Sequence, residues 1–149
     1  MNKTIPALLM LATISGPLGA QEKNTDTTGC IRVRVGNLRN TQGMVGVSLY
    51  DTKQGFPDKP EKAIEGRSVA AGDHCEVVFT NVPYGSYAVS VLHDENGNKK
   101  MDKSFIGIPR EGFGTSNNPK IRRGPPSFSE SCFTLGSCEL ALKIDMNYF

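Results

Sequence analysis

The stretch from His93 to Asp102 carries side chains that could bind a metal ion or move a proton. It reads His-Asp-Glu-Asn-Gly-Asn-Lys-Lys-Met-Asp. Counted from its first aspartate, oxygen-bearing residues stand at positions one, three, five and nine, and they are Asp94, Asn96, Asn98 and Asp102. Proteins bind calcium through oxygen ligands with this spacing, delivered from a short and tight loop. The spacing therefore predicts a calcium site in this loop.

Two positions differ from the calcium loop that is flanked by helices. Position six, which is glycine in that loop, is Lys99 here, and position twelve, which is glutamate there, is Phe105. Only two carboxylates then remain, with Glu95 as a third if its side chain turns inward, so we expect modest affinity. The alternative is a polar hairpin whose Asp and Asn side chains bond to their own backbone.

His93 directly precedes Asp94, and the two side chains could form an acid-base pair in a small metal-assisted enzyme. His74 is the second histidine of the chain, and a metal site with two histidines requires a fold that brings both together. The sequence contains no G-x-S-x-G motif. We therefore expect a protein that is not an enzyme, in which His93 orients a loop by hydrogen bonding at a binding site.

A long segment from Lys103 to Phe128 follows, rich in Gly, Pro and Asn and without sustained alternation. A connection of this length in a small domain is usually functional, and its apolar residues argue against disorder. We expect an ordered lid folded over one end of the domain. Its basic residues form a candidate binding set for an anion, and a solvated basic loop is the alternative. Besides His93, this set contains Arg110, Lys120, Arg122 and Arg123.

Strands must position these segments, because apolar and polar residues alternate in steps of two through most of the chain. About seven short strands are expected, near residues 31–35, 45–49, 67–70, 75–79, 87–91, 132–135 and 140–144. This count and spacing predict an all-β chain that forms a single antiparallel β-sandwich, immunoglobulin-like or transthyretin-like. The one helical turn expected covers residues 58–64, with Asp58 as its cap.

Residues 1–20 have the three parts of a secretory signal peptide, namely Lys3, an apolar run over 7–14 and a small-residue exit over 16–20. We expect a flexible segment over residues 21–29 and the sandwich domain over residues 30–149. The apolar run is too short to span a bilayer. No transmembrane segment is expected once the signal is removed, and the protein should be periplasmic or secreted. Across 149 residues, 17 Lys and Arg face 15 Asp and Glu, which excludes a nucleic-acid binder that works by bulk charge.

If the protein is exported, its four cysteines are expected to form two disulfides. An even number of cysteines in an oxidising compartment favours disulfide bonds over zinc binding. The parity of the strands places Cys75 and Cys138 inward and Cys30 and Cys132 outward. Parity therefore favours the disulfides Cys75–Cys138 and Cys30–Cys132. A Cys132–Cys138 bridge across a local turn is the rival.

The run Phe-x-Asn-Val-Pro-x-Gly-x-Tyr, from Phe79 to Tyr87, forms a corner between two strands. Pro83 sets the dihedral angle that begins the turn, and the Tyr87 hydroxyl can bond to backbone as corner tyrosines do. Together with HDENGN, IGIPREGFG, SNNP and GPPSF further on, the sequence resembles the exported bacterial proteins of domain-of-unknown-function family 2141, over roughly residues 31–146. The corner alone also resembles transthyretin-like and collagen-adhesin B-type sandwiches.

That resemblance implies a small exported β-sandwich whose loop commonly has glycine at the position of Lys99 and does not require the four cysteines. It implies no particular activity. We expect an accessory or binding module of the bacterial envelope, with an envelope or extracellular partner that the sequence does not identify. Its working end should comprise residues 94–102 and 103–128, and calcium is the one cofactor expected. The alternatives are a metal-assisted enzyme that uses His93 and Asp94, and a purely structural module without a ligand.

Overall fold

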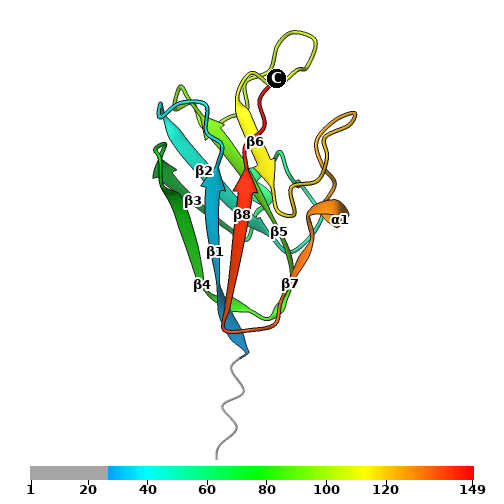
Figure 1. The fold of residues 1–149 in the computed structure, drawn as a ribbon. Helices are drawn as coiled ribbons and strands as arrows, with labels where there is room; N and C mark the ends of the chain where they lie inside the picture. The colour runs from blue at the N-terminus through cyan, green and yellow to red at the C-terminus, as the bar shows by residue number, and fades with distance from the viewer. Residues whose placement is uncertain (1–26) are drawn as a thin grey trace, which may run out of the picture.

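Alternating apolar side chains build two β-sheets that face each other in the computed structural model of the protein (Figure 1). The structure describes residues 27–149. The signal peptide expected over residues 1–20, and all but the last three residues of the flexible segment expected over 21–29, lie outside the described residues. The strands are β1 (Thr28–Gly36), β2 (Met44–Tyr50), β3 (Glu65–Ala70), β4 (Cys75–Pro83), β5 (Gly85–Asp94), β6 (Gly112–Thr115), β7 (Phe133–Leu135) and β8 (Glu139–Asp145).

One sheet has three strands in the order β4-β1-β8, and the other has the order β3-β2-β5-β6. Strand β7 also pairs with β5, at the end of β5 that β6 does not reach. The expected all-β sandwich is thereby confirmed, and all seven predicted strands are present. Two features differ from the expectation. Strand β6 was not predicted, and β8 runs parallel to β1, whereas all other neighbours are antiparallel.

The core lies between the sheets and consists of the inward residues of the alternating strands. Its fully buried members include Ile31, Val33, Leu49, Phe79 and Val89, each at 0% exposure. Burying apolar surface of this kind contributes roughly 25 cal/mol per Å². Strands with one apolar and one polar face gain this contribution only when a second sheet covers the apolar face, which explains why the alternation of the sequence yields a sandwich.

Two glycines let the C-terminal part of the chain pack closely on β6. A Cβ atom at Gly112 would lie 2.3 Å from the Tyr148 ring, and one at Gly114 would lie 2.8 Å from Ile144. Between them, Phe113 pairs with Asn147 as an isolated bridge that joins the two sheets along one side. The alternating glycines of the Glu-Gly-Phe-Gly-Thr segment are therefore a packing device.

The segment expected as one lid over residues 103–128 is divided by β6, and only its first part lies at an end of the sandwich. Its second part, with α1 (Phe128–Ser131), lies to one side of the sandwich, where α1 contacts β5 of the larger sheet (Figure 1). There Tyr50 points outward yet is 1% exposed, because its ring contacts Phe56, which in turn contacts Phe128. The second part of the segment thus belongs to a small outer core.

Local predictions had mixed outcomes. The Tyr87 hydroxyl donates to the Pro83 carbonyl at 2.8 Å, which confirms the tyrosine corner. The helical turn is a short 3₁₀ helix, η1 (Pro60–Lys62), whose cap is Lys59, so the expected cap at Asp58 is wrong. Helix α1 was not predicted, although Ser127 and Glu130 cap each other reciprocally in a capping box. No helix among residues 27–149 has the length and apolar character needed to cross a membrane.

All four cysteines are free thiols in the structure. Along β1, Val35 pairs with Cys75 and Cys30 pairs with Glu139, the residue after Cys138. These two positions are separated by roughly 16 Å of strand at about 3.3 Å per residue. A disulfide joins Cα atoms about 4.4–6.8 Å apart. The pairing Cys75–Cys138 is therefore excluded, and the inward position expected for Cys138 is also wrong, because Cys138 is exposed.

Candidate functional site

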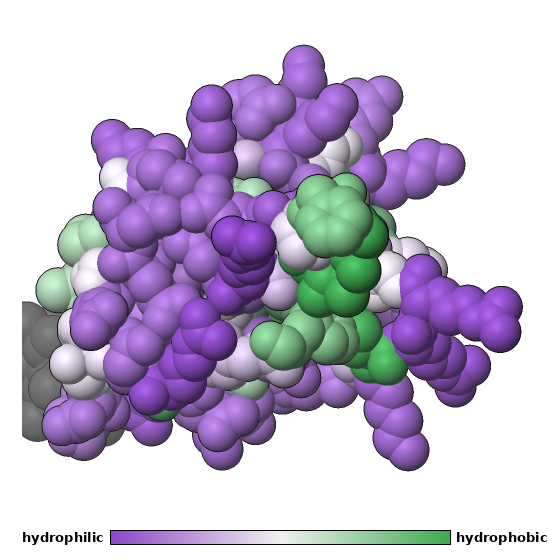
Figure 2. Space-filling view, turned by 90° about the horizontal axis from the view of Figure 1, so that it is seen from above, coloured by the Kyte–Doolittle hydropathy of each residue, from purple (hydrophilic) through white to green (hydrophobic). Residues whose placement is uncertain are grey.

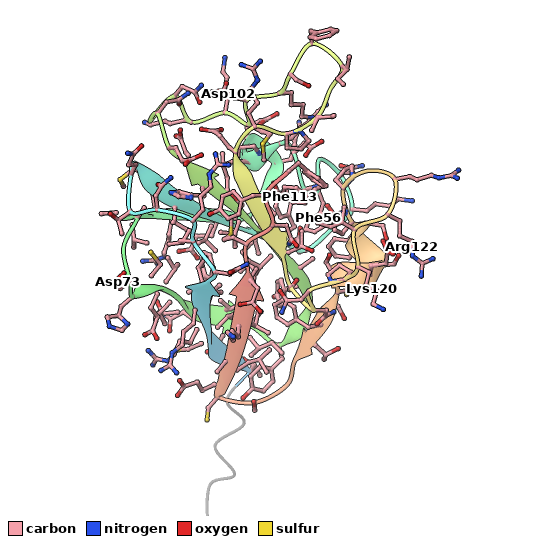
Figure 3. The ribbon with its side chains drawn as sticks, turned by 45° about the horizontal axis from the view of Figure 1, so that its top comes forward. Phe56, Asp73, Asp102, Phe113, Lys120 and Arg122 are labelled. Carbon is pink, nitrogen blue, oxygen red and sulfur yellow. The ribbon has the colours of Figure 1, made fainter. Side chains whose placement is uncertain are left out.

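One end of the sandwich, the upper end in Figure 1, gathers the segments that could carry a site. The β1–β2 connection, the β5–β6 connection and the C-terminal residues all lie there. Figure 3 shows Asp102 at this end, in the β5–β6 connection. The predicted calcium loop, residues 94–102, begins at the last residue of β5 and continues into this connection.

Asp94 organises the 94–102 loop through its carboxylate. Its Oδ1 accepts from the backbone N–H groups of Gly97 and Asn98 at 2.8 and 3.1 Å, and its Oδ2 accepts from Lys99 at 2.7 Å. The side chain is 5% exposed. Three N–H donors that converge on one carboxylate fix the backbone of the loop around it. Asp94 is therefore the structural centre of the loop.

Asp102 joins the other end of the loop to its two asparagines. Its carboxylate oxygens accept from the side-chain amides of Asn96 and Asn98, at 2.5 and 2.9 Å. The amide oxygens of the same asparagines accept from the backbone N–H groups of Asn98 and Lys100. The structure thus brings the four predicted ligands into one hydrogen-bonded loop.

Glu111 is a further carboxylate of this loop, and sequence reasoning missed it. Its two oxygens accept from the backbone N–H groups of Glu95 and Asp102, each at 3.1 Å, so that it bridges the two ends of the loop. The side chain is 4% exposed. Residues 103–110 separate Glu111 from the loop in sequence, which explains why the spacing rule did not find it. Its position directly before the alternating Gly112 and Gly114 was the available signal.

Glu95 does not turn toward the loop. It forms an ion pair and a hydrogen bond with Arg39 and accepts a further bond from Asn40, both in the β1–β2 connection. The bond with Arg39 holds the pKa of Glu95 below its usual value. Arg39 also donates to the Arg110 carbonyl at 2.9 Å. Glu95 therefore ties two connections together at the upper end, and the third carboxylate that contacts the 94–102 loop is that of Glu111.

Lys99 has a left-handed backbone, with φ at 62°. This is the conformation that glycine supplies at position six of a calcium loop, so the backbone has the expected geometry although the residue is lysine. A non-glycine residue in this conformation is strained by about 1–2 kcal/mol. Lys99 therefore keeps the backbone conformation of a calcium loop, and having lysine instead of glycine there costs conformational strain.

Replacing Lys99 by glycine is expected to raise the free energy of unfolding by about 0.5–1 kcal/mol, because relief of strain exceeds the greater freedom of glycine in the unfolded chain. Urea unfolding measures this change. The matched control is Lys100→Gly, which removes the same charge at a residue that has no left-handed backbone. That variant should be neutral or less stable, and equal effects of the two substitutions would contradict the argument from strain.

His93 is completely buried, at 0% exposure, and both ring nitrogens have partners. Its Nε2 lies 2.8 Å from the Gln42 carbonyl oxygen and its Nδ1 lies 2.8 Å from the Tyr148 hydroxyl. A carbonyl only accepts, so Nε2 carries a proton and donates to it. Burial raises the pKa of the Tyr148 hydroxyl, which also accepts from the Arg39 backbone N–H at 3.2 Å. The imidazole thereby joins the β1–β2 connection to the C-terminal segment.

The other residues of the predicted binding set fall into two places. Arg110 pairs through its backbone N–H with the Asp102 carbonyl at 2.8 Å and belongs to the upper end. Lys120, Arg122 and Arg123 are exposed on the connection between β6 and α1, and Figure 3 shows Lys120 and Arg122 apart from Asp102. His74 is exposed just before β4, in the smaller sheet, whereas His93 belongs to the larger sheet. The structure therefore does not unite these basic residues in one site.

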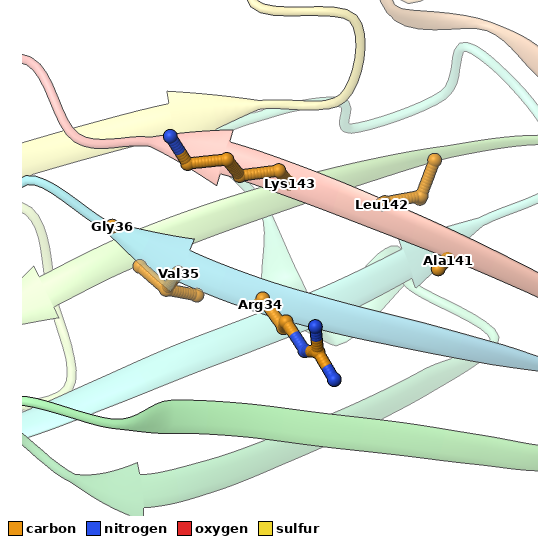
Figure 4. Close-up of a pocket in the computed structure, with 6 residues that line it drawn as sticks. All are labelled: Arg34, Val35, Gly36, Ala141, Leu142 and Lys143. Atoms are coloured by element: carbon orange, nitrogen blue, oxygen red, sulfur yellow. The ribbon is translucent and has the colours of Figure 1, made fainter.

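Two surface hollows are lined by residues outside the 94–102 loop. One hollow of about 270 Å³ lies along β1 and β8 (Figure 4), and its lining residues are Arg34, Val35, Gly36, Ala141, Leu142 and Lys143. Another, of about 400 Å³, includes His74 and Cys75.

Within residues 27–149, no group of three or more His, Cys, Asp or Glu side chains has the arrangement of a metal site. The loop at the upper end combines carboxylates with amide oxygens.

The fold and this loop define a small β-sandwich protein with an oxygen-rich polar site at one end of its two sheets. The family model of DUF2141, described as an uncharacterized protein conserved in bacteria, matches residues 33–142, and the chain belongs to that family. The resemblance that the sequence motifs suggested is thereby confirmed. Neither the comparison with curated proteins nor the comparison with solved structures found a match.

Proposed function

We propose that the protein is an exported accessory module of the bacterial envelope whose 94–102 loop binds a calcium ion. The observation that carries the calcium proposal is Glu111. It brings a buried carboxylate to the loop from the residue just before β6, on the far side of the 103–110 insertion. Calcium loops of this kind use a final glutamate to complete the ligand set. In the linear sequence the corresponding position is Phe105, so no glutamate stands there.

The donor chemistry of the loop suits calcium. The side chains of Asp94, Asn96, Asn98, Asp102 and Glu111 offer only oxygen as ligands, and calcium takes six to eight oxygens in flexible geometry. No ion pair of the described residues uses Asp94, Asp102 or Glu111. Two of these carboxylates are at most 5% exposed and have only backbone N–H partners. Buried negative charge without a cationic partner favours a bound cation.

Calcium in this loop would supply a cross-link between the end of β5 and the start of β6. For this, the amides of Asn96 and Asn98 would turn their oxygens inward and release Asp102. The alternative is a structural loop that the existing hydrogen bonds complete. The two proposals differ in what calcium does to the stability of the folded protein, because only a ligand that binds the folded state raises it.

The alternative of an enzyme that uses His93 and Asp94 has no specific observation in its favour. His93 is buried with both ring nitrogens bonded, and the Asp94 carboxylate is bonded to three backbone N–H groups of its own loop. An acid-base pair needs a group within reach of a substrate proton. Both side chains instead serve the arrangement of the upper end.

Thermal unfolding with about 5 mM calcium and with chelator tests the proposal. At a Kd of about 0.1–1 mM, typical of extracellular modules, calcium should add about 1–2.3 kcal/mol of stability. For a domain of this size, this raises Tm by roughly 4–9 °C. The variants Glu111→Gln and Asp102→Asn should each reduce the calcium-dependent shift to less than half, because each removes one charged ligand.

The matched control is Asp73→Asn, an exposed aspartate in the β3–β4 turn (Figure 3). It should leave the calcium-dependent shift unchanged. Titration calorimetry with calcium should give one site per chain. An absence of any Tm shift in wild-type protein would overturn the calcium proposal, and an undiminished shift in Glu111→Gln would place the ion elsewhere.

A further inference from the structure

The hairpin formed by residues 102–110, called here the tip hairpin, carries exposed apolar side chains at the upper end. Phe105 is 99% exposed, Ile106 is 65% exposed and Ile108 is 46% exposed. Figure 2 looks down on this end and shows an apolar patch surrounded by hydrophilic residues. Large apolar side chains gathered at one point and rimmed by polar residues mark an interaction site.

The tip hairpin is held by its own backbone bonds. Arg110 N–H donates to the Asp102 carbonyl, and Ser104 N–H donates to the Ile108 carbonyl, each at 2.8 Å. Lys103 and Pro109 form a β-bridge. Gly107 makes the turn with φ at 84°, and a Cβ atom there would have open space around it. The apolar side chains are therefore presented on an ordered, convex projection.

Positive charge surrounds this projection. Lys103 and Arg110 stand at the two sides of the hairpin base, and Lys99 and Lys100 lie in the adjoining 94–102 loop. None of these four side chains takes part in an ion pair of the described residues. The nearby Asp102 accepts from two asparagines, and Glu111 is buried, so the outward charge next to the apolar tip is positive.

We propose that the tip hairpin inserts into the surface of a membrane that contains anionic lipid. Apolar side chains flanked by Lys and Arg are the combination that binds the boundary between headgroups and acyl chains. The convex shape favours a membrane over a protein partner, because a stable protein interface needs about 800 Å² on each side, far more than three side chains offer. This inference goes beyond the proposed function and does not require calcium in the loop.

Vesicle flotation tests the proposal, using the protein without its first 26 residues in buffer with chelator. Vesicles of phosphatidylcholine with about 30% phosphatidylglycerol should bind the protein, and vesicles of phosphatidylcholine alone should bind it much more weakly. The variant Phe105→Ser/Ile106→Ser should bind at least about tenfold more weakly, because both side chains lose their burial in lipid. The variant Lys103→Gln/Arg110→Gln should bind about 25-fold more weakly, at roughly fivefold per cation.

The controls are Ile64→Ser and Tyr84→Ser, exposed apolar residues outside the upper end, and Lys143→Gln, an exposed lysine of β8. Each should bind the anionic vesicles like the wild type, and all variants should keep the wild-type Tm, because the replaced side chains are exposed. The absence of binding to anionic vesicles would overturn the proposal, as would equal binding by Phe105→Ser/Ile106→Ser. Sedimentation that gives a dimer for the wild type and a monomer for this variant, without vesicle binding, would instead identify a second copy as the partner.

Discussion

Replacing His93 by alanine is expected to lower the free energy of unfolding by about 3–4 kcal/mol, which would be among the largest effects of a single substitution in this chain. The imidazole is fully buried and makes two bonds of 2.8 Å. Its removal leaves a cavity and deprives the Gln42 carbonyl and the Tyr148 hydroxyl of their partner. Urea unfolding monitored by far-ultraviolet circular dichroism measures this loss.

Tyr148→Phe is the matched comparison, because it removes one of the two bonds without creating a large cavity. It should lower the free energy of unfolding by about 1 kcal/mol. If His93→Ala cost no more than Tyr148→Phe, the imidazole would not be the link between the β1–β2 connection and the C-terminal segment.

Replacing Asp94 by alanine is expected to lower the free energy of unfolding by about 2–3 kcal/mol in the presence of chelator. The change leaves the N–H groups of Gly97 and Lys99 without their acceptor and removes one of the two acceptors of the Asn98 N–H, which keeps its bond to the Asn96 amide oxygen. Hydrogen exchange at these three amides should accelerate more than at the strands, since the loop loses its centre. Urea unfolding gives the change for the whole domain.

Asp73→Ala serves as the control, since Asp73 is exposed in a turn at the same end and should change stability by less than about 0.5 kcal/mol. Asp94→Asn should fall between the two, because one acceptor oxygen remains. Unchanged exchange at Gly97 and Lys99 in Asp94→Ala would show that the loop is organised by other groups.

The sandwich was predictable from the sequence because most of its strands bury one face. Val45, Val47 and Leu49 alternate with other residues, and each is at most 1% exposed, so the pattern of the sequence reports the pattern of burial. Strand β6 breaks this correspondence. Two of its four residues are glycine, which leaves no apolar side chain to mark the inward face. Its place in the sheet is determined by the close approach of the C-terminal segment.

Only those residues of the candidate site that lie close together in the sequence were predictable. Asp94, Asn96, Asn98 and Asp102 follow one another closely, and a spacing rule finds them. Glu111 and Tyr148 reach the upper end through strand pairing, which a spacing rule does not contain. The predicted disulfide Cys75–Cys138 is wrong for the same reason. Parity gives the face of a sheet on which a residue lies but not its position along the strand. The register of the strands places Cys75 and Cys138 at opposite ends of β1.

The parallel pairing of β1 with β8 has a consequence for how the molecule is made. The middle strand of the smaller sheet is among the first residues of the described chain, and its neighbour β8 is among the last. A growing polypeptide therefore has one side of β1 open until β8 has been synthesised. Because contacts between distant parts of a chain are slow to form, we expect the smaller sheet to be completed late in folding, once β8 is available to pair with β1.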